Sequence, residues 1–499
     1  MDNLDAALAA WSGSAAVGPG RSPDWPRTGI AIEGDFSGIQ QFVLRPVPGA
    51  GGAARRLRAR SFRVLALTKL VAATVEKRLC EAGAKVFYSA GGRFLVVAGF
   101  CADWGQRLAS LQSELDGDLL RTYHGELVFH LAGAEFSDGK IPVDGLRHAM
   151  GHRKRTPLAN AVQTDCGWAS NCFCFRATQA AKCDGCGSTA VLNNEEDDGV
   201  RVQLCQTCVD DRELGKALLH GTRAGLGRSP RGSIAVLGEK WTASSQGEIP
   251  IPLISHAPVE GDGLATFEQL ARRSAGRQYL AYLRIDADRI GQEFSKLEGN
   301  PQRTWGLSRL LDEAFTSGIT KLLQTRFPNL YPVYGGGDDL FLIGPWNDAL
   351  KFAVEWRNEF RGISGDRLTF SAGCALAKPR QHILTKSEEA KDALDQAKEH
   401  RDSIHALGAT ISWSDFDEVY ASGDKLAKFH TSGQIKSALL YNIMNLHDRW
   451  VKGDERGIRA CFIKWNATSP GRPSALLNRR SYRPDASGNM QVLWCAMRR

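Results

Sequence analysis

The sequence lacks any apolar run near the ~20 residues that a membrane-spanning helix needs. The stretch from Val64 to Val75, for example, is interrupted by Lys69. The first residues also do not read as a signal peptide. We therefore expect a cytoplasmic protein that has no membrane partner. Twelve cysteines are present, and in that reducing compartment the Cys-x₂-Cys pairs among them would bind metal rather than form disulfides.

The chain also lacks basic clusters interleaved with aromatic residues in the way that a base-stacking platform for single strands requires. Its net charge is a modest +8, but basic residues gather in two places. One cluster, which contains no acid, comprises Arg55, Arg56, Arg58, Arg60 and Arg63, and the other runs from Arg147 to Arg155. Either cluster could contact the phosphate backbone of an RNA or an acidic partner protein. A solvated basic helix face is the alternative for each.

What is present is a chain of 499 residues with 43% hydrophobic side chains. This length exceeds one ordinary core and indicates roughly three to four domains. Residues 1–28 are rich in Ala, Gly, Ser and Pro, and we expect a flexible lead-in there. Residues 242–263 are expected to form a linker.

The segment from Tyr331 to Ile343 predicts a β-hairpin with two carboxylates at its tip. Three glycines allow the positive φ angles of the turn, and an apolar strand follows at once. The adjacent charges of Asp338 and Asp339 are costly unless a cation neutralises them. Mg²⁺ or Mn²⁺, bound by carboxylate oxygens and substrate phosphates, meets that demand. An ordinary Asp-rich surface turn is the alternative. The glycines are Gly335, Gly336 and Gly337.

A second acidic motif lies upstream of the hairpin. Residues 279–285 read as a short strand that delivers Asp286 and Asp288 at its carboxyl end, and residues 305–327 carry apolar side chains at helical spacing. In an antiparallel sheet this strand end and the hairpin tip can lie side by side. Asp286 and Asp338 could then hold metal ions over a triphosphate in a two-metal site. The combination favours nucleotidyl transfer over a purely structural role.

The spacing Cys183-x₂-Cys186, eighteen residues, Cys205-x₂-Cys208 predicts a tetrahedral Zn²⁺ site. All four positions around the ion would be filled, so the expected role is structural. Four free thiols in a small core are the alternative. Three further cysteines lie just upstream with irregular spacing, and they would form either an auxiliary site or free thiols. These are Cys166, Cys172 and Cys174.

The strand ending in Asp286-Ala-Asp288 and the Gly-Gly-Asp-Asp hairpin together resemble the palm domain shared by nucleotidyl cyclases, diguanylate cyclases and polymerases. The continuation fits, because residues 367–377 read as a strand and residues 386–405 as a helix. In diguanylate cyclases a lysine on the matching helix holds the nucleotide phosphates. The resemblance implies that role for Lys398, and a solvated helix lysine is the alternative.

The same pattern occurs earlier in the chain. A strand begins near Gly29 and ends in GDFSGIQQF, which echoes residues 288–294, and an apolar helix spans residues 61–79. Residues 88–98 then parallel the acidic hairpin, but Arg93 stands where the other hairpin has an acid. A strand at 126–134 and a helix at 143–152 complete this copy. It is expected to bind metal poorly, although Gly91, Gly92 and Arg93 could still cradle a nucleotide.

Two tandem palms, a zinc ribbon between them and an intact final Gly-Gly-Asp-Asp resemble the large subunit of type III CRISPR effector complexes, most closely the Csm type, over residues 29–499. The resemblance implies an antiviral nucleotidyltransferase that joins ATP into cyclic oligoadenylates when target RNA pairs with the guide RNA. Its partners would be the other effector subunits and both RNAs. Asp286, Asp338 and Asp339 would hold Mg²⁺ or Mn²⁺, and Lys398 would counter the charge of the triphosphate.

One departure from that family concerns the HD-type nuclease domain with which many members begin. The earliest histidine here is His124, and the single His-Asp pair, His447-Asp448, reads as an exposed helix pair. We therefore expect this chain to lack the single-strand DNase activity. Two other functions stay open: a signalling enzyme similar to diguanylate cyclases, and a catalytically silent RNA-binding scaffold.

The fold class that follows is α+β, with two tandem ferredoxin-like palm domains facing each other. The expected order is the flexible segment 1–28, the first palm 29–160 with its degenerate Gly-Gly-Arg hairpin, and a zinc-binding insert and linker 161–265. The second, GGDEF-like catalytic palm spans 266–415, and a helical C-terminal domain spans 416–499. The amphipathic pattern of residues 434–451 predicts the clearest helix of that last domain.

Overall fold

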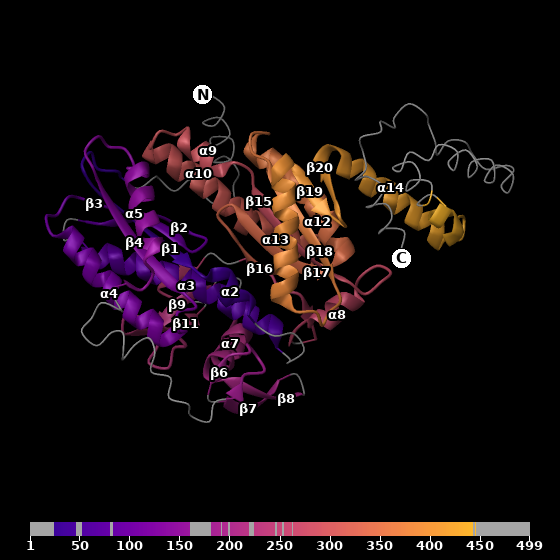
Figure 1. Cartoon of the computed structure of the whole chain (residues 1–499), viewed down its shortest axis with the longest axis horizontal. Coiled ribbons are helices and arrows are strands. Elements are labelled where there is room, and N and C mark those ends of the chain that lie inside the picture. Colours follow the sequence, from indigo (N-terminus) through magenta and orange to yellow (C-terminus); the bar gives the residue numbers. More distant parts are fainter. Residues whose placement is uncertain are drawn as a thin grey trace.

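The structure is a computed structural model. It describes residues 24–45, 52–79, 83–159, 181–190, 192–197, 200–218, 224–244, 247–251, 254–261, 263–442 and 445. Figure 1 shows two sheet-and-helix units side by side, an indigo and purple one and an orange one, with a magenta segment below them. In the described part of the chain, no helix is long and apolar enough to cross a membrane.

The first unit is an antiparallel four-stranded sheet in the order β2-β3-β1-β4. Its central strand β1 reads GIAIEGDFS and is buried along most of its length. The strands are β1 (Gly29–Ser37), β2 (Lys85–Ala90), β3 (Arg93–Ala98) and β4 (Val128–Phe136). The helices are α2 (Ile39–Leu44), α3 (Ala53–Leu79), α4 (Trp104–Tyr123) and α5 (Val143–Arg155). These elements confirm the predicted order of strand, helix, hairpin, strand and helix.

The second unit repeats this order in a larger sheet, β16-β17-β15-β18-β19-β20. Its first four strands match the strands of the first unit one for one. The strands are β15 (Leu280–Ala287), β16 (Tyr331–Gly336), β17 (Asp339–Pro345), β18 (Phe370–Ala377), β19 (Ser403–Ala406) and β20 (Ala409–Ser412). The helical segments are α8 (Phe267–Arg272), α9 (Ile290–Ser295), α10 (Pro301–Glu313), a π-helical turn (Ala314–Gly318), α11 (Ile319–Thr325), α12 (Trp346–Ser364), α13 (Ile383–His400) and α14 (Trp413–Thr431).

The helix predicted for residues 386–405 is wrong at its C-terminal end. α13 stops at His400, because Arg401 and Asp402 take positive φ angles of 63° and 43°. The chain then turns into β19, which pairs with β18 in parallel. The fifth and sixth strands of the sheet therefore come from residues that the sequence pattern had placed in the helix or left unassigned.

In the sequence, the cysteine-containing segment and a small sheet lie between the two units. The first part holds β5 (Ala181–Lys182), β6 (Thr189–Ala190), β7 (Leu192–Asp197), β8 (Val200–Cys205) and α7 (Gln206–Ala217). The small sheet has the order β10-β11-β9-β12, and a two-stranded piece follows it. These strands are β9 (Ala224–Arg228), β10 (Ile234–Val236), β11 (Glu239–Ser244), β12 (Ile249–Ile251), β13 (Val259–Glu260) and β14 (Gly263–Leu264). The predicted linker 242–263 thus contributes strands to these sheets.

The two units share one hydrophobic core. Successive residues of β15 alternate between two clusters. Leu280 and Tyr282 belong to a cluster that includes apolar residues of α8 and α13 and continues into α3 and α4 of the first unit, whereas Ala281 and Leu283 belong to a cluster with α10 and α12. This alternation follows from the twofold periodicity of a strand. The second sheet is therefore covered on both faces, and α3 of the first unit adds contacts at its edge strand β16. A buried hydrogen bond of 2.7 Å, from Tyr331 Oη to the carbonyl of Ala54, crosses the same interface.

Several sequence predictions fall on residues outside this description. They include the lead-in up to residue 23, the upstream cysteines Cys166, Cys172 and Cys174, the His447-Asp448 pair and most of the helical C-terminal domain. Of that domain, α14 is described. Its Trp413 is fully buried in the core of the second unit and donates from Nε1 to the carbonyl of Phe370 at 2.8 Å.

Candidate active site

The second hairpin brings the predicted glycines and carboxylates to one end of the second sheet. β16 ends at Gly336, β17 begins at Asp339, and Gly337 and Asp338 form the turn between them. The φ angles of Gly336 and Gly337 are 146° and 66°, in the region that other residues rarely adopt. A Cβ atom on Gly335 would lie 2.5 Å from an isoleucine side chain. The tip consequently presents bare backbone.

Asp286 lies beside this turn because β15 and β17 are antiparallel neighbours. Asp286 is the register partner of Asp339. The backbone N–H of the next residue, Ala287, donates to the carbonyl of Asp338 at 2.9 Å. The strand end and the hairpin tip therefore lie side by side, as the sequence predicted, and the three aspartates gather at one end of the sheet.

Lys398 of α13 reaches the same place. Its Nζ atom lies 2.8 Å from Asp286 Oδ1, and about a quarter of each side chain is exposed (26% and 27%). The helix can approach the sheet closely because β18 has Gly373 beneath it. A Cβ atom at Gly373 would lie only 2.1 Å from the backbone nitrogen of Leu394. A lysine one turn further along this helix is thereby brought within reach of the strand end.

Burial holds the pKa values of Asp339 and Asp286 above their usual range. Burial, followed by the charges of Asp338 and Asp286, raises the pKa of Asp339 to about 7, although Arg284 and Lys398 oppose this shift. Burial also raises the pKa of Asp286, and the hydrogen bond and charge of Lys398 partly offset that effect. Such a site gains stability from an added cation.

The carboxylate group suits a divalent ion that is shared with a substrate. In the cysteine quartet, described below, the ligand atoms all lie within 4.8 Å of one another. Among the described residues, this quartet is the group of three or more metal-binding side chains that meets this limit. The three aspartates are spaced more widely than that. Mg²⁺ is usually held by one or two carboxylates together with substrate phosphates, so an open, incomplete carboxylate set is the arrangement that such an ion needs.

Asp288, the second acid of the strand motif, has a different place. It is 5% exposed and accepts hydrogen bonds from Ser371 Oγ at 2.7 Å and from Thr369 Oγ1 at 2.8 Å. The backbone N–H of Asp402 donates to it as well, at 2.9 Å. Its oxygens are thus occupied in tying β15 to β18 and to the start of β19. Asp288 stabilises the sheet end rather than facing a substrate.

The first hairpin has the same geometry with different charges. Gly91 and Gly92 form its turn with φ angles of 59° and 89°, and Arg93 is the register partner of Asp35. By register, Asp35 matches Asp286, whereas the sequence comparison had aligned the GDFSGIQQF strand end with Asp288. Arg93 correspondingly matches Asp339.

Two cations neutralise Asp35. Arg93 Nη2 lies 3.1 Å from Asp35 Oδ2, and Lys154 of α5 also pairs with this carboxylate. Lys154 thus repeats the relation of Lys398 to Asp286, on the helix that follows the fourth strand of the unit. The sequence analysis had placed Lys154 in a basic cluster. Its pairing with Asp35, 119 residues away, has no signal in the local sequence.

The two hairpin tips meet each other. A Cβ atom on Gly91 would lie 3.6 Å from the carbonyl oxygen of Gly336. Helix α3 of the first unit contacts β16 of the second, and α10 of the second unit contacts β2 of the first. The contacts are reciprocal, so the two turns lie against each other at the junction of the units.

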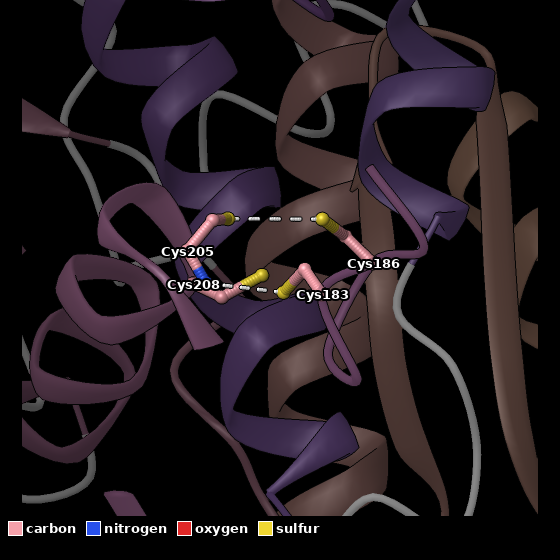
Figure 2. Close-up of side chains that lie close together, drawn as sticks. All are labelled: Cys183, Cys186, Cys205 and Cys208. Carbon is pink, nitrogen blue, oxygen red and sulfur yellow. Dashed lines mark hydrogen bonds between the residues drawn. The ribbon is translucent and has the colours of Figure 1, made fainter. Parts of the chain in front are cut away.

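The four predicted cysteines form a second site, which Figure 2 shows. Their sulfur atoms all lie within 4.8 Å of one another, and all four residues are buried. Cys186 Sγ and Cys205 Sγ are 3.8 Å apart, and the backbone N–H of Cys205 donates to Cys183 Sγ at 3.2 Å. A Zn–S bond of about 2.3 Å implies sulfur atoms about 3.8 Å apart in a tetrahedron. The thiols therefore fit a zinc ion.

The arginine cluster of α3 is a correction to the sequence analysis. Arg56, Arg58 and Arg60 are 0%, 4% and 2% exposed, and Arg55 is half-buried. Arg58 Nη1 donates to the carbonyl of His256 at 2.8 Å. Arg63 is buried as well, at 3% exposed. The predicted basic surface is therefore wrong for these four arginines, which contact other parts of this chain instead of solvent.

The contacts of Arg60 explain why a buried guanidinium group is tolerated in α3. Its Nε atom lies 2.7 Å from Asp211 Oδ2, while Arg63 Nη2 lies 2.8 Å from Asp211 Oδ1. Arg60 also donates to the carbonyl of Phe42 at 3.0 Å and lies 3.6 Å from Cys208 Sγ. Desolvation makes a buried charge expensive unless it is paired, and Asp211 supplies that pairing from the helix that follows the cysteines.

The strand order, the acids at one sheet end and the lysine on the following helix define a palm domain of the nucleotidyltransferase class. Residues 279–405 match the family described as Cas10/Cmr2, second palm domain. Residues 30–156 match the family described as Csm1 subunit domain B.

Curated relatives agree with these matches. The chain is 25% identical over 501 residues to the CRISPR system single-strand-specific deoxyribonuclease Cas10/Csm1 (subtype III-A) of Thermococcus onnurineus, which covers 87% of this chain and 64% of the relative. It is 33% identical over 165 residues to the protein of the same name from Enterococcus italicus, which covers 31% of this chain and 21% of the relative. The chain is similar to Cas10/Csm1 proteins over most of its length, and it spans less than two thirds of the length of the Thermococcus relative.

Solved structures show the same fold. The Csm1-Csm4 cassette in its apo form matches with a TM-score of 0.71 and 19% identity, covering 99% of this chain and 73% of that chain. The cassette in complex with cA3 matches with a TM-score of 0.69 and 20% identity, covering 98% and 72%. At this identity the likeness establishes the fold alone.

Proposed function

We propose that this chain is the large subunit of an RNA-guided type III antiviral complex, in which it converts ATP to cyclic oligoadenylates when target RNA is bound. The observation that carries this proposal is the gathering of Asp286, Asp338 and Asp339 beside Lys398 at the end of the second sheet. Related Csm1-Csm4 cassettes have been solved in complex with one ATP, with cA3 and with cA4, which supports the same chemistry here.

The reaction is the attack of a ribose hydroxyl oxygen on the α-phosphorus of a second ATP. A new P–O bond forms, the bond to the β-phosphate oxygen breaks, pyrophosphate leaves, and the hydroxyl proton passes to water. A protein contributes to this reaction mainly by positioning the nucleotides and neutralising their charge. Ring closure repeats the same step within one chain of adenylates.

The site residues divide these tasks. Asp286, Asp338 and Asp339 would hold Mg²⁺ or Mn²⁺, which supplies charge neutralisation at the phosphates when bound. The bare backbone at Gly335, Gly336 and Gly337 would let a phosphate approach the turn closely. Lys398 would contact the triphosphate; in the structure its ammonium group is held by Asp286, 2.8 Å away.

The first unit would be a degenerate palm. Asp35 has the place of Asp286, but Arg93 and Lys154 neutralise it, so a metal ion would find little net negative charge there. Arg93 keeps 52% of its side chain exposed. With the backbone of Gly91 and Gly92, it could cradle a nucleotide without a metal ion and hold it opposite the second hairpin.

The cysteine quartet would bind structural zinc. All four ligand positions would be filled by thiolates, which leaves no open position for a substrate. The two Cys-x₂-Cys turns come from residues 183–186 and 205–208, which are separate in sequence and have a small core of their own. Zinc would join them and fix the start of α7 beside α3.

These assignments correspond to a first palm at 29–160, a zinc-binding insert at 161–265, a second palm at 266–415 and a C-terminal domain at 416–499. The partners would be other type III subunits, guide RNA and target RNA. One related structure is named as a Csm1-Csm4 subcomplex in the type III-A CRISPR-Csm interference complex, which supports this assembly.

Product analysis tests the proposed function. The chain, purified with its native partners, is incubated with Mg²⁺ or Mn²⁺ and an equimolar mixture of ATP and GTP, with and without guide-matched target RNA. We expect cyclic oligoadenylates in the mass spectrum only when target RNA is present. Cyclic di-GMP regardless of RNA would assign the chain to the diguanylate cyclases. No product from a complex shown to bind target RNA would favour a silent scaffold.

A further inference from the structure

A small cavity lies beneath the two hairpin tips, at the junction of the units. Its lining comes from both units: Lys69 of α3 and Ser89 to Gly91 from the first, and Asp312 of α10 with Gly335 and Gly336 from the second. The cavity holds about 10 Å³, roughly the space of one water molecule. Lys69 and Asp312 are the charged side chains of this lining, and the sequence predicted a site role for neither.

Lys69 is attached to the first hairpin. Its Nζ atom donates to the carbonyl of Ser89 at 3.0 Å, two residues before the turn glycine Gly91. Burial lowers the pKa of Lys69, and the negative charge of Asp312 raises it. Desolvation thus disfavours the charged form of Lys69, whereas an acid from the opposite unit favours it.

Asp312 is attached to the second hairpin. A Cβ atom on Gly336 would lie 3.5 Å from its Oδ1 atom. Burial raises the pKa of Asp312, whereas the charge of Lys69 and hydrogen bonding from the Gly337 backbone lower it. Thr316 Oγ1 donates to the backbone carbonyl of Asp312 at 2.5 Å, inside the π-helical turn that follows α10. The carboxylate therefore lies against the turn that carries Asp338.

We propose that Lys69 and Asp312 are positioning residues that couple the two hairpins, and thereby set the distance between the two nucleotides that react. Lys69 is bonded to the Ser89 carbonyl, Asp312 lies beside Gly336, and both side chains line the same cavity. Each half of this pair belongs to a different unit, so neither hairpin keeps its place unless the other does. This inference rests on the proposed function for its kinetic consequence but not for its structural one.

A residue that positions the reacting groups affects kcat and KM differently from a residue that is needed only for folding. The cavity that both side chains line has room for about one water molecule, too little for a nucleotide, so we expect the loss of either one to leave the binding groups at Asp286 and Lys398 intact. A displacement of the reacting atoms by about 1 Å can cost about 100-fold in rate. Variants at these two positions should therefore lower kcat more than they change KM for ATP.

The test uses the full chain in its native complex and compares Lys69→Met, Lys69→Arg and Asp312→Asn with Asp348→Asn. Asp348 is a matched control, because burial also raises its pKa and Asn329 donates to it, but it lies on α12 away from the hairpins. We expect kcat to fall about tenfold to 100-fold in Lys69→Met and Asp312→Asn, with KM within about threefold. Lys69→Arg should recover most of the rate, and Asp348→Asn should match the wild type. Equal kinetics in all variants would overturn the proposal.

Hydrogen exchange tests the coupling of the two hairpins independently of catalysis. In Lys69→Met, which alters the first unit, we expect faster amide exchange in the peptide that contains Gly337 of the second unit. In Asp312→Asn, the peptide that contains Ser89 should likewise exchange faster. If each variant affects only the hairpin of its own unit, the coupling is wrong even when the wild type makes product. If the cross-effects are present but the wild type makes no product, the proposed function fails and the coupling stands.

Discussion

Lys398 Nζ lies 2.8 Å from Asp286 Oδ1, and this pair joins the helix that would hold a triphosphate to the strand end that would hold a metal ion. The lysine supplies a cation beside the carboxylates at the end of the second sheet. A metal ion held by these carboxylates would compete with the ammonium group for Asp286, and the phosphates of a nucleotide would offer the ammonium group another partner.

Lys398→Met tests this arrangement, with Lys391→Met as the control on the exposed face of the same helix. Loss of a charged donor at the reacting phosphates should lower kcat/KM for ATP by about 100-fold, whereas Lys391→Met should leave it unchanged. Initial rates of adenylate synthesis at varied ATP concentrations measure both. Equal rates in the two variants would show that Lys398 is merely a solvated lysine of the helix.

The zinc prediction concerns the four clustered thiols. Metal analysis of the purified chain should give one zinc ion per molecule, and Cys205→Ser should lose it together with a lower unfolding temperature, since metal binding and folding of such sites are coupled. Cys374→Ala provides a control, because Cys374 is buried in the second unit, outside the quartet. A Cys205→Ser protein with wild-type stability and zinc content would contradict the assignment.

The buried pairing of Asp211 with Arg60 and Arg63 should contribute strongly to stability. Asp211→Asn leaves two buried guanidinium groups without their carboxylate, which is expected to cost about 3–5 kcal/mol in the free energy of unfolding. The control is Asp144→Asn at an exposed pair, where Arg147 and Asp144 are 66% and 93% exposed, and no measurable change is expected. Denaturant titration of both variants measures the difference, and equal midpoints would refute this role.

A pH dependence of stability follows from His256. Burial lowers its pKa from 6.5 to about 4, with the Pro328 carbonyl opposing and Arg58 adding to the shift. Between these two values the unfolded chain binds a proton that the folded chain excludes, so stability falls as the pH is lowered from 6.5 to 4. His256→Gln should lose less stability over that window than the wild type, while exposed His400→Gln should follow the wild type. Thermal unfolding at a series of pH values checks the slopes.

Local sequence patterns predicted the parts of this fold that depend on local chemistry. The glycine turns at 91–92 and 336–337 require positive φ angles, and the strands beside them carry continuous apolar runs. Both hairpins and their partner strands were therefore predictable. The Cys-x₂-Cys turns were predictable for a similar reason, because two ligands of each pair lie within one short turn.

The errors arose where a residue's partner is remote in sequence. The arginines of α3 resemble a surface cluster until Asp211, 151 residues from Arg60, is brought beside them. Lys154 and Asp35 are separated by 119 residues. The end of α13 at His400 depends on a parallel pairing of β19 with β18, which no local pattern reports. Long-range electrostatic pairing was therefore the part of the site that the sequence could not supply.

We propose that Asp338 and Asp339 serve catalysis rather than assembly. The double variant Asp338→Ala, Asp339→Ala should retain the subunit composition and the target-RNA binding of the complex. Its yield of cyclic oligoadenylate should fall at least about 100-fold, since the charge-neutralising ion would lose its ligands. The deciding measurement is mass spectrometry of products from wild-type and variant complexes at equal concentration with target RNA. Undiminished product from the variant, or a variant complex that falls apart, would contradict the account.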